Sequence, residues 1–282
     1  MEAARLGTEP LDEVVPVPVA APRGNPARAF LVEAGQLGAF AAGALLALAG
    51  SFRYAAEILR QAGILIFGSA LLIVGMQLVI GGECALFGSY FTRAYGANGY
   101  IGLVTSICGV REMVPYMFGY VFAAKVGCGL VAELGSMRIS EELDAMESLG
   151  IDPMRFVVAT RIAATWLCVP FLFCASLAVH TLANYLVVVV QIAEVSQGGW
   201  EGAHWFFQSP SDVLFSLIKV MAMATTIVVV GMYYGYRARG GPIGVGAATA
   251  RSMVLNLVLI HMIGGALTML FWGFDPRYPV GG

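Results

Sequence analysis

Two adjacent charged residues, Arg111 and Glu112, lie within a long apolar stretch and are soon followed by Pro115. A charge at membrane depth costs on the order of 2.5–3.5 kcal/mol on insertion scales, so such a residue normally pairs or faces water. Neighbouring residues on a helix point about 100° apart, so these two side chains cannot simply neutralise each other. We therefore expect at least one of them to face a hydrated cavity or another helix.

Glu83, in the preceding apolar stretch, is the candidate partner for Arg111. Two interpretations of Arg111 and Glu112 stay open: a structural ion pair, or a polar marker on a substrate pathway. An amphiphilic substrate would place its polar head against these charges and its tails along apolar side chains such as Met76 and Met117. The candidate cavity residues are therefore Arg111, Glu112, Glu83, Met76 and Met117.

The two lysines of the chain, Lys125 and Lys219, also lie in apolar stretches. A lysine in such a place commonly extends its ammonium group to the membrane surface, and we expect both to do so. Each is followed by valine, so the phosphate-binding motif G-x-x-x-x-G-K-[ST] is absent. If ATP drives this protein, a separate subunit binds and hydrolyses it.

Other reactive residue types give no catalytic pattern. His180 and His261 each stand alone in an apolar stretch, so we expect buried, hydrogen-bonded side chains. The five cysteines lack C-x-x-C spacing and lie in apolar surroundings, which indicates small hydrophobic residues. With no H-E-x-x-H or G-x-S-x-G motif either, we expect no catalytic residue, no metal and no cofactor.

A polar segment at 132–153, A-E-L-G-S-M-R-I-S-E-E-L-D-A-M-E-S-L-G-I-D-P, separates two of the apolar stretches. Apolar residues recur in it at helical spacing: Ile139, Leu143, Met146 and Leu149. This predicts a short amphipathic helix with Ser140 as its N-cap and Gly150 at its end. A soluble helix held between membrane spans is well placed to dock a partner at the membrane surface.

The composition is that of an integral membrane protein. Of 282 residues, 59% are hydrophobic and 12% are charged, whereas soluble domains are about 25% charged. The net charge of −2 argues against a nucleic-acid partner. A span needs about 20 apolar residues, and five stretches meet this requirement: Gly63 to Thr92, Gly99 to Val131, Phe156 to Val190, Val213 to Tyr236 and Val254 to Trp272.

The basic residues predict the orientation, because cytoplasmic loops carry an excess of arginine and lysine. With the N-terminus inside, the cytoplasmic side receives Arg5, Arg23, Arg28, Arg53, Arg60, Arg138, Arg155, Arg161, Arg237, Arg239 and Arg251. The outer side receives Arg93 and Arg277, so the polar segment is cytoplasmic and the C-terminus external.

This orientation divides the chain into four parts. We expect a disordered cytoplasmic tail at 1–28, interfacial helices at 29–62, a transmembrane domain at 63–275 and an external C-terminal tail at 276–282. Residues 30–50 are long enough to cross the membrane but carry Glu33 and Gln36, so a span there is the alternative to interfacial helices.

Three motifs resemble the MlaE/YrbE family of permeases, which serve ABC-type lipid transporters that work with Mce-domain proteins. V-R-E-M-V-P at 110–115 is similar to the family's R-E-x-x-P in its second span. Residues 132–153 are closely similar to its cytoplasmic coupling segment, and we use that name for them below. Y-Y-G-Y-R-A-R-G-G-P-I-G-V-G at 233–246 resembles actinobacterial YrbE proteins of the B type more than the A type.

The resemblance covers about residues 60–275 and implies an all-α membrane protein. Its parts would be interfacial helices, five transmembrane helices, and a cytoplasmic coupling helix between spans 2 and 3. It also implies a second permease (identical, or the other member of an A/B pair), a cytoplasmic ABC ATPase, Mce-domain proteins on the outer face, and membrane lipids as cargo. The family's R-E pair maps onto Arg111 and Glu112, and its coupling residues map onto Glu133, Arg138, Glu141 and Glu142. The predicted docking stripe adds Ile139, Leu143 and Met146.

We therefore expect a non-catalytic permease subunit of an ATP-driven, Mce-associated transporter in the cytoplasmic (inner) membrane. It would move lipid or fatty-acid-like substrates across or out of that membrane. The alternative is an ATP-independent secondary transporter or channel that uses Arg111 and Glu112 as an ion or proton relay. Inverted repeats would favour this alternative, and the sequence shows none. The lipid, its direction of travel and the identity of the second permease stay open.

Overall fold

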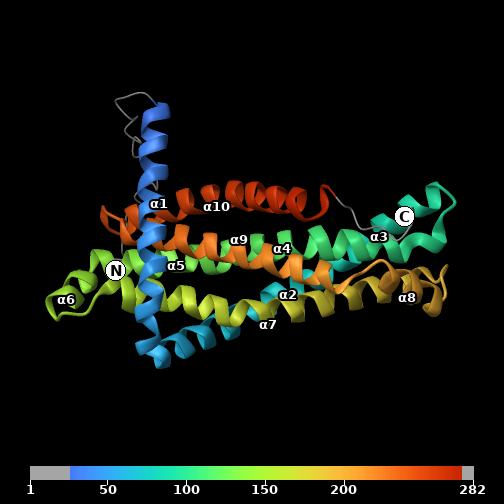
Figure 1. Cartoon of the computed structure of the whole chain (residues 1–282), viewed down its shortest axis with the longest axis horizontal. Helices are drawn as coiled ribbons and strands as arrows, with labels where there is room; N and C mark the ends of the chain where they lie inside the picture. The colour runs from blue at the N-terminus through green and yellow to red at the C-terminus, as the bar shows by residue number, and fades with distance from the viewer. Residues whose placement is uncertain (1–25, 275–282) are drawn as a thin grey trace, which may run out of the picture. The chain divides into compact units, whose positions relative to one another are not determined.

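The structure is a computed structural model that describes residues 26–274, which are helical apart from short turns (Figure 1). The expected tails lie outside these residues, except that residues 26–28 begin a helix. Five helical stretches are long and apolar enough to cross a membrane: Ala27–Ala94, Asn98–Ile139, Met154–Ile192, Pro210–Tyr236 and Gly241–Trp272. Each contains one of the five expected spans, so the all-α membrane fold is confirmed.

The first stretch contains two helices. α1 (Pro26–Ser51) ends in a single 3-10 turn (Phe52–Tyr54), and α2 (Ala55–Ala94) then runs unbroken for 40 residues. Residues 55–62 are therefore continuous with the first span. The residues up to Gly38 form a unit of their own, whose side chains from Ala27 onwards are mostly exposed, and everything below concerns the larger unit that begins at Ala39.

The second and third stretches are interrupted by π-helical turns. The second comprises α3 (Ile101–Cys108), a π turn (Gly109–Met113), α4 (Val114–Phe122), a second π turn (Ala123–Gly127) and α5 (Cys128–Ile139). After α6 (Glu142–Ser148), the third comprises a π turn (Met154–Ala159), α7 (Thr160–Tyr185) and another π turn (Leu186–Ile192). α8 (Gln197–Phe206), α9 (Pro210–Tyr236) and α10 (Gly241–Trp272) complete the chain.

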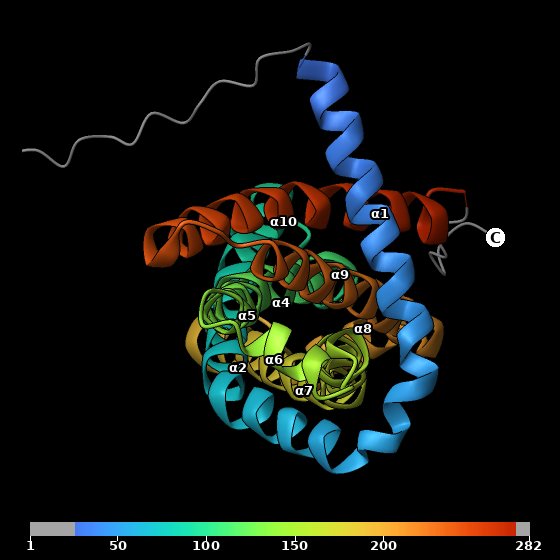
Figure 2. The same cartoon turned by 90° about the vertical axis from the view of Figure 1, so that its left-hand side faces the viewer.

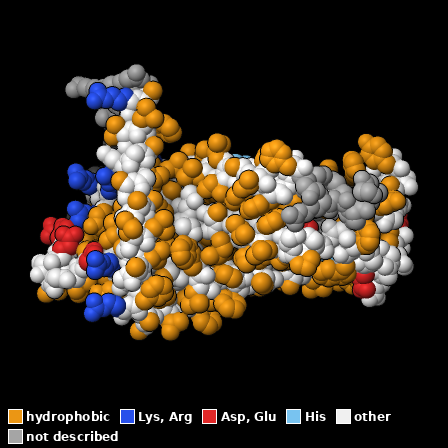
Figure 3. All heavy atoms as spheres, viewed as in Figure 1, with side chains coloured by type: hydrophobic (Ala, Val, Ile, Leu, Met, Phe, Trp, Pro, Cys, Tyr) orange, Lys and Arg blue, Asp and Glu red, His pale blue; other side chains and the backbone are white. Residues whose placement is uncertain are grey.

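The long helices of the larger unit pack side by side. α2 packs along α7, while α9 packs against α4, α5, α7 and α10, as the end-on view shows (Figure 2). Large apolar side chains such as Phe118, Phe173 and Ile227 fill the interior. On the face shown in Figure 3 the middle carries many hydrophobic side chains and almost no charged ones, and charged side chains gather towards the ends, most of them at the end formed by α6. This distribution suits a bundle whose middle lies in hydrocarbon.

The C-terminal half of α1 lies across the α6 end of the bundle. The ring of Phe40 is 5.7 Å from that of Tyr233 and 6.0 Å from that of Tyr236, at the end of α9. A Cβ on Gly50 would lie 3.2 Å from Cδ of Arg155, just before α7. Because both contacts are at one end of the bundle, residues 40–50 run over that end and not along the spans. The interfacial position of residues 29–62 stays a prediction.

The opposite end is closed by α8. Gly102 of α3 allows the close approach of α8, since a Cβ there would lie 2.7 Å from the carbonyl oxygen of Trp200. The buried imidazole of His204 stacks on the Trp200 ring at 4.6 Å, and its Nδ1 lies 3.5 Å from Oγ1 of Thr105. Burial away from water lowers the pKa of His204 to about 4, so this histidine is neutral at physiological pH.

Candidate functional site

Pro115, just after the π turn in the second span, removes one backbone donor from the helix. Pro115 has no N–H, so it cannot donate to the carbonyl four residues earlier, on Arg111, or five residues earlier, on Val110. α9 supplies both donors: Oγ of Ser216 is 2.7 Å from the oxygen of Val110, and Nζ of Lys219 is 2.9 Å from that of Arg111. The R-E-x-x-P motif is thus completed by side chains of a distant helix.

Arg111 forms a buried ion pair with Asp212 at the start of α9. Its Nη2 lies 3.3 Å from Oδ1 of Asp212, and both side chains are at most 6% exposed. The indole Nε1 of Trp272 donates to the same carboxylate at 2.6 Å, and the guanidinium lies 5.3 Å from the Trp272 ring centroid. The expectation that Glu83 pairs with Arg111 is wrong, because the exposed side of α2 carries Glu83 while Arg111 faces α9.

Glu112 pairs with Lys219, one turn above Ser216 on α9. The distance from Nζ of Lys219 to Oε2 of Glu112 is 2.8 Å, and Oγ1 of Thr268 lies 2.7 Å from Nζ and 2.9 Å from Oε1. The Lys219 side chain is fully buried, so our expectation that it extends to the membrane surface is wrong. Three oxygen atoms inside the bundle bind the Lys219 ammonium group in place of water.

These contacts bring Arg111 and Glu112 into one node but give them different surroundings. Arg111 is enclosed, which fits the interpretation of a structural ion pair. The Glu112 side chain keeps 33% of its surface exposed, so the node reaches the bundle surface at this carboxylate. Met117 follows on α4 and is half-buried, whereas Met76 and Glu83 both lie on the exposed side of α2, outside these ion pairs.

A polar stripe continues from Glu112 along α4. Tyr116 and Tyr120 follow at four-residue intervals with ring centroids 6.2 Å apart, and Oη of Tyr120 is 2.8 Å from Nε2 of His261 on α10. Nδ1 of His261 lies 2.8 Å from the carbonyl of Leu257, so in the neutral ring Nδ1 carries the proton and Nε2 accepts from the Tyr120 hydroxyl. Of the two histidines expected to be buried and hydrogen-bonded, His261 is hydrogen-bonded but exposed, and His180 is buried but has no hydrogen-bond partner among the described residues. Exposed polar groups on a span are costly in lipid unless they meet water or a polar ligand.

The coupling segment forms two helices. α5 continues through Ile139, and Glu141 then adopts a left-handed conformation, with φ +60°, before α6 begins at Glu142. Ser140 therefore caps the end of α5 and is not the N-cap of the next helix. Gly150, with φ +76°, follows α6 as expected.

Contacts with the bundle fix the position of α6. Leu143 is fully buried, so it anchors α6 to the bundle and cannot belong to a docking surface as expected. Arg138 holds Asp144 at 2.6 Å and lies over the ring of Tyr236, 5.8 Å from its centroid. The predicted docking stripe therefore divides: Leu143 faces inwards, Met146 is half-buried, and Ile139 is 39% exposed.

The outward side of the segment is acidic with one apolar projection. Glu141 and Glu142 are exposed, the side chain of Asp144 is 57% exposed, and Leu149 is 77% exposed. A surface of this kind suits a partner with a basic rim and an apolar pocket.

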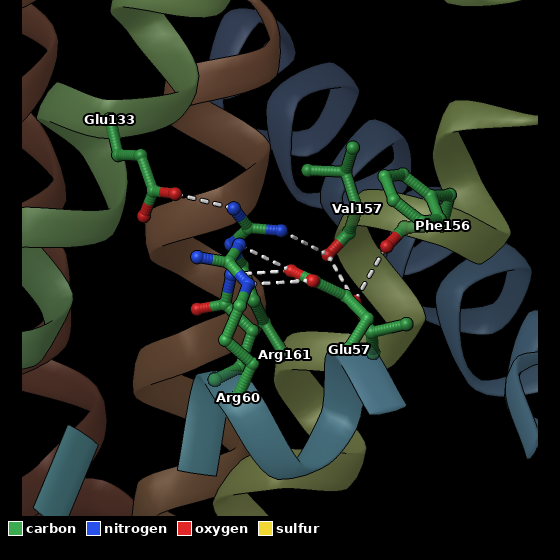
Figure 4. A network of polar contacts seen from close by, with 8 residues as sticks. Glu57, Arg60, Glu133, Phe156, Val157 and Arg161 are labelled. Atoms are coloured by element: carbon green, nitrogen blue, oxygen red, sulfur yellow. Dashed lines mark hydrogen bonds and ion pairs between the residues drawn. The ribbon is translucent and has the colours of Figure 1, made fainter. Parts of the chain in front are cut away.

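Glu133 of α5 is part of a second polar network, at the α6 end of the bundle (Figure 4). Its carboxylate accepts a hydrogen bond from Nη2 of Arg161 on α7, and Nη1 of Arg161 donates to the carbonyl of Val157 at 3.0 Å. On the neighbouring α2, Glu57 accepts two hydrogen bonds from Arg60, at 2.7 and 2.8 Å. Glu133 is thus held by the bundle, besides being 46% exposed.

Sequence reasoning missed the partners of the charged pair. Asp212, Ser216 and Lys219 follow one another at intervals of four and three residues, which puts all three on one face of a helix. That spacing was the available signal, because a polar face on an otherwise apolar span must bind something inside the membrane. Among residues 26–274 no group of three or more metal-ligand side chains is present, and the node itself is filled by its own ion pairs.

Comparison with known proteins gives consistent matches. The family model described as "Permease MlaE" matches residues 58–270. A probable ABC transporter permease protein of Rickettsia prowazekii is 29% identical over 221 residues, which cover 78% of this chain and 84% of that protein. One from Synechocystis is 32% identical over 178 residues, covering 63% and 67%. The intermembrane phospholipid transport system permease protein MlaE of Haemophilus influenzae is 25% identical over 244 residues, covering 86% and 94%.

Proposed function

Because the chain belongs to the MlaE permease family, we propose that it is the membrane-spanning subunit of an ATP-driven lipid transporter whose ATP is bound by a separate ABC ATPase. The name of the related Haemophilus protein, a phospholipid transport permease, supports a lipid cargo. The observation that carries the proposal is α6: a short, exposed, acidic helix that is anchored by Leu143 between two spans. Such a helix can receive a movement from a docked ATPase and pass it to the bundle.

Docking would use the outward side of the coupling segment. Glu141 and Glu142 would meet basic residues of the ATPase, and Leu149 would enter an apolar pocket between them. Glu133 and Arg138 would contribute less directly, because each already has an ion-pair partner within this chain.

The test is co-purification of the ATPase with tagged chain from native membranes. Glu142→Lys combined with Leu149→Asp should release the ATPase and leave membrane insertion intact. Glu201→Lys, a matched charge reversal on α8 at the opposite end, should keep the ATPase bound. Equal recovery of the ATPase with both variants would contradict the docking surface. Wild-type chain that brings no ATPase, but still moves lipid without ATP, would favour the alternative of a secondary transporter or channel.

Glu112 would mark the polar part of the lipid path. It is the member of the charged node that reaches the surface, and it continues into the stripe of Tyr116, Tyr120 and His261. A lipid headgroup could lie along this stripe while its tails contact apolar side chains such as Met117. A photo-crosslinker at position 112 should then capture lipid in the assembled transporter, and capture of protein neighbours alone would make the whole node structural. We assign Arg111 to the structural part of the node, since it is enclosed.

The remaining parts of the proposal concern the assembly. The arginine distribution supports an inner-membrane protein with its N-terminus and α6 in the cytoplasm. Family membership supports a second permease, identical or paired as A and B, and Mce-domain proteins on the outer face. Cross-linking of native membranes, followed by identification of the captured chains, tests both partners.

A further inference from the structure

The π turn Met154–Ala159 and the first turn of α7 are the meeting point of three segments that are far apart in the sequence. Arg155 packs against α1, and the ring of Phe156 packs edge-on against Tyr54 with centroids 5.1 Å apart. One turn later, Arg161 forms its ion pair with Glu133 of α5. The start of α7 therefore touches both the α1–α2 connection and the helix that leads into α6.

Arg161 is held by more than one element at once. Its side chain is 7% exposed, and its two terminal nitrogens serve acceptors in different directions, the carboxylate of Glu133 and the carbonyl of Val157. Glu57 of α2 lies near the same guanidinium, although its carboxylate is bonded to Arg60 and Gln61 (Figure 4). The planar fork of arginine can satisfy such separated acceptors, whereas the single ammonium of lysine serves one direction well.

The two side chains of the Arg161–Glu133 ion pair are buried to different extents, and this difference determines which of them must move with the other. Glu133 is 46% exposed, so water could solvate its carboxylate if it moved away. Arg161 is enclosed, and a buried guanidinium without its anion is strongly unfavourable. A displacement of α5 that moves Glu133 will therefore draw Arg161, and with it the start of α7, in the same direction.

We propose that Arg161 is the positioning residue that carries a displacement of the coupling segment into α7 and the α1–α2 connection. This inference rests on the proposed function and specifies the path by which docking at α6 reaches the spans. Arg161 would touch neither the ATPase nor the lipid; it would act through Glu133 and Val157.

The experiment uses the intact transporter in vesicles and measures two rates, ATP hydrolysis and lipid transfer, together with ATPase recovery. Arg161→Gln should keep the ATPase bound and hydrolysing ATP, while the lipid transferred per ATP falls between about twofold and thirtyfold. Glu133→Gln should lower the same ratio, counted per ATP hydrolysed by the ATPase that stays bound. Arg161→Lys, which keeps the charge but serves only one direction well, should recover part of the lost ratio.

Arg60→Gln is the matched control. It removes an arginine from the same network, but Arg60 is 60% exposed and its partner Glu57 lies on its own helix, so transfer per ATP should stay at the wild-type value. An unchanged ratio in Arg161→Gln, or an Arg161→Lys variant no better than Arg161→Gln, overturns the inference. Wild-type transporter that lacks an ATPase overturns the proposed function instead, and the inference with it.

Discussion

Lys219→Met is the sharpest test of the charged node. The substitution keeps an unbranched apolar side chain in a fully buried position and removes the ammonium group. Three acceptors lose their donor: the Glu112 carboxylate at 2.8 Å, the Thr268 hydroxyl at 2.7 Å and the Arg111 carbonyl at 2.9 Å.

The expected cost follows from the burial of each acceptor. Removing one partner of a buried ion pair costs about 3–5 kcal/mol. The Glu112 side chain is 33% exposed, so water can hydrate the unpaired carboxylate, and we expect a cost at the lower end of this range, about 3 kcal/mol. Loss of the hydrogen bond to the Arg111 carbonyl, to which Pro115 has no N–H to donate, adds about 1 kcal/mol. We therefore expect Lys219→Met to lower the free energy of unfolding by about 4 kcal/mol.

The assay is a double-mutant cycle by equilibrium unfolding of the purified chain in mild detergent. Glu112→Gln removes the charge that Lys219→Met leaves unpaired, so the double variant should be more stable than Lys219→Met alone by about 2 kcal/mol. The reasoning is refuted if Lys219→Met lies within about 1 kcal/mol of the wild type. It is equally refuted if the double variant recovers nothing.

Three further predictions follow from the same geometry. Ser216→Ala should lower the free energy of unfolding by about 1 kcal/mol in the wild-type chain. In a Pro115→Ala chain, whose residue 115 has an N–H that can donate to the Val110 carbonyl, the same substitution should change it hardly at all; thermal unfolding of the four combinations measures both effects. The stability contributed by His204 should be complete above pH 6.5 and lost as the pH falls towards 4, because His204 binds a proton more readily in the unfolded chain than in the folded one. The loss is at most about 3 kcal/mol, and pH-dependent unfolding of a His204→Gln chain should not show it. Leu149→Asp should weaken ATPase retention by about tenfold without changing the unfolding midpoint, whereas Leu143→Asp should lower that midpoint, because only Leu143 is buried.

The spans could be predicted from the sequence because hydrocarbon imposes a simple requirement. A stretch of apolar residues long enough to cross the membrane has no alternative to a helix, since every backbone group must be bonded internally. The break inside the coupling segment could not be predicted, because glutamate rarely adopts the positive φ that Glu141 has. The helical pattern continues through this residue, so periodicity alone predicted one helix from 139 to 150.

For the charged node, the sequence predicted that partners were needed but not which residues they are. That Arg111 and Glu112 needed partners followed from their depth and their angular offset on a helix. Choosing Asp212 over Glu83 required knowing that α9, and not the exposed side of α2, faces the π turn. Spacing shows which residues share a face, but not which helix that face meets.

Asp212, Ser216 and Lys219 contact the second span at three successive levels, through Arg111, the Val110 carbonyl and Glu112 together with the Arg111 carbonyl. Sliding α9 along its axis by one residue, about 1.5 Å, would put all three donors and acceptors out of register together. Shear between these two helices is therefore opposed by every contact of the node at once. Rotation of the two as one rigid body breaks none of them, so a working transporter can rearrange around this pair of helices but not between them.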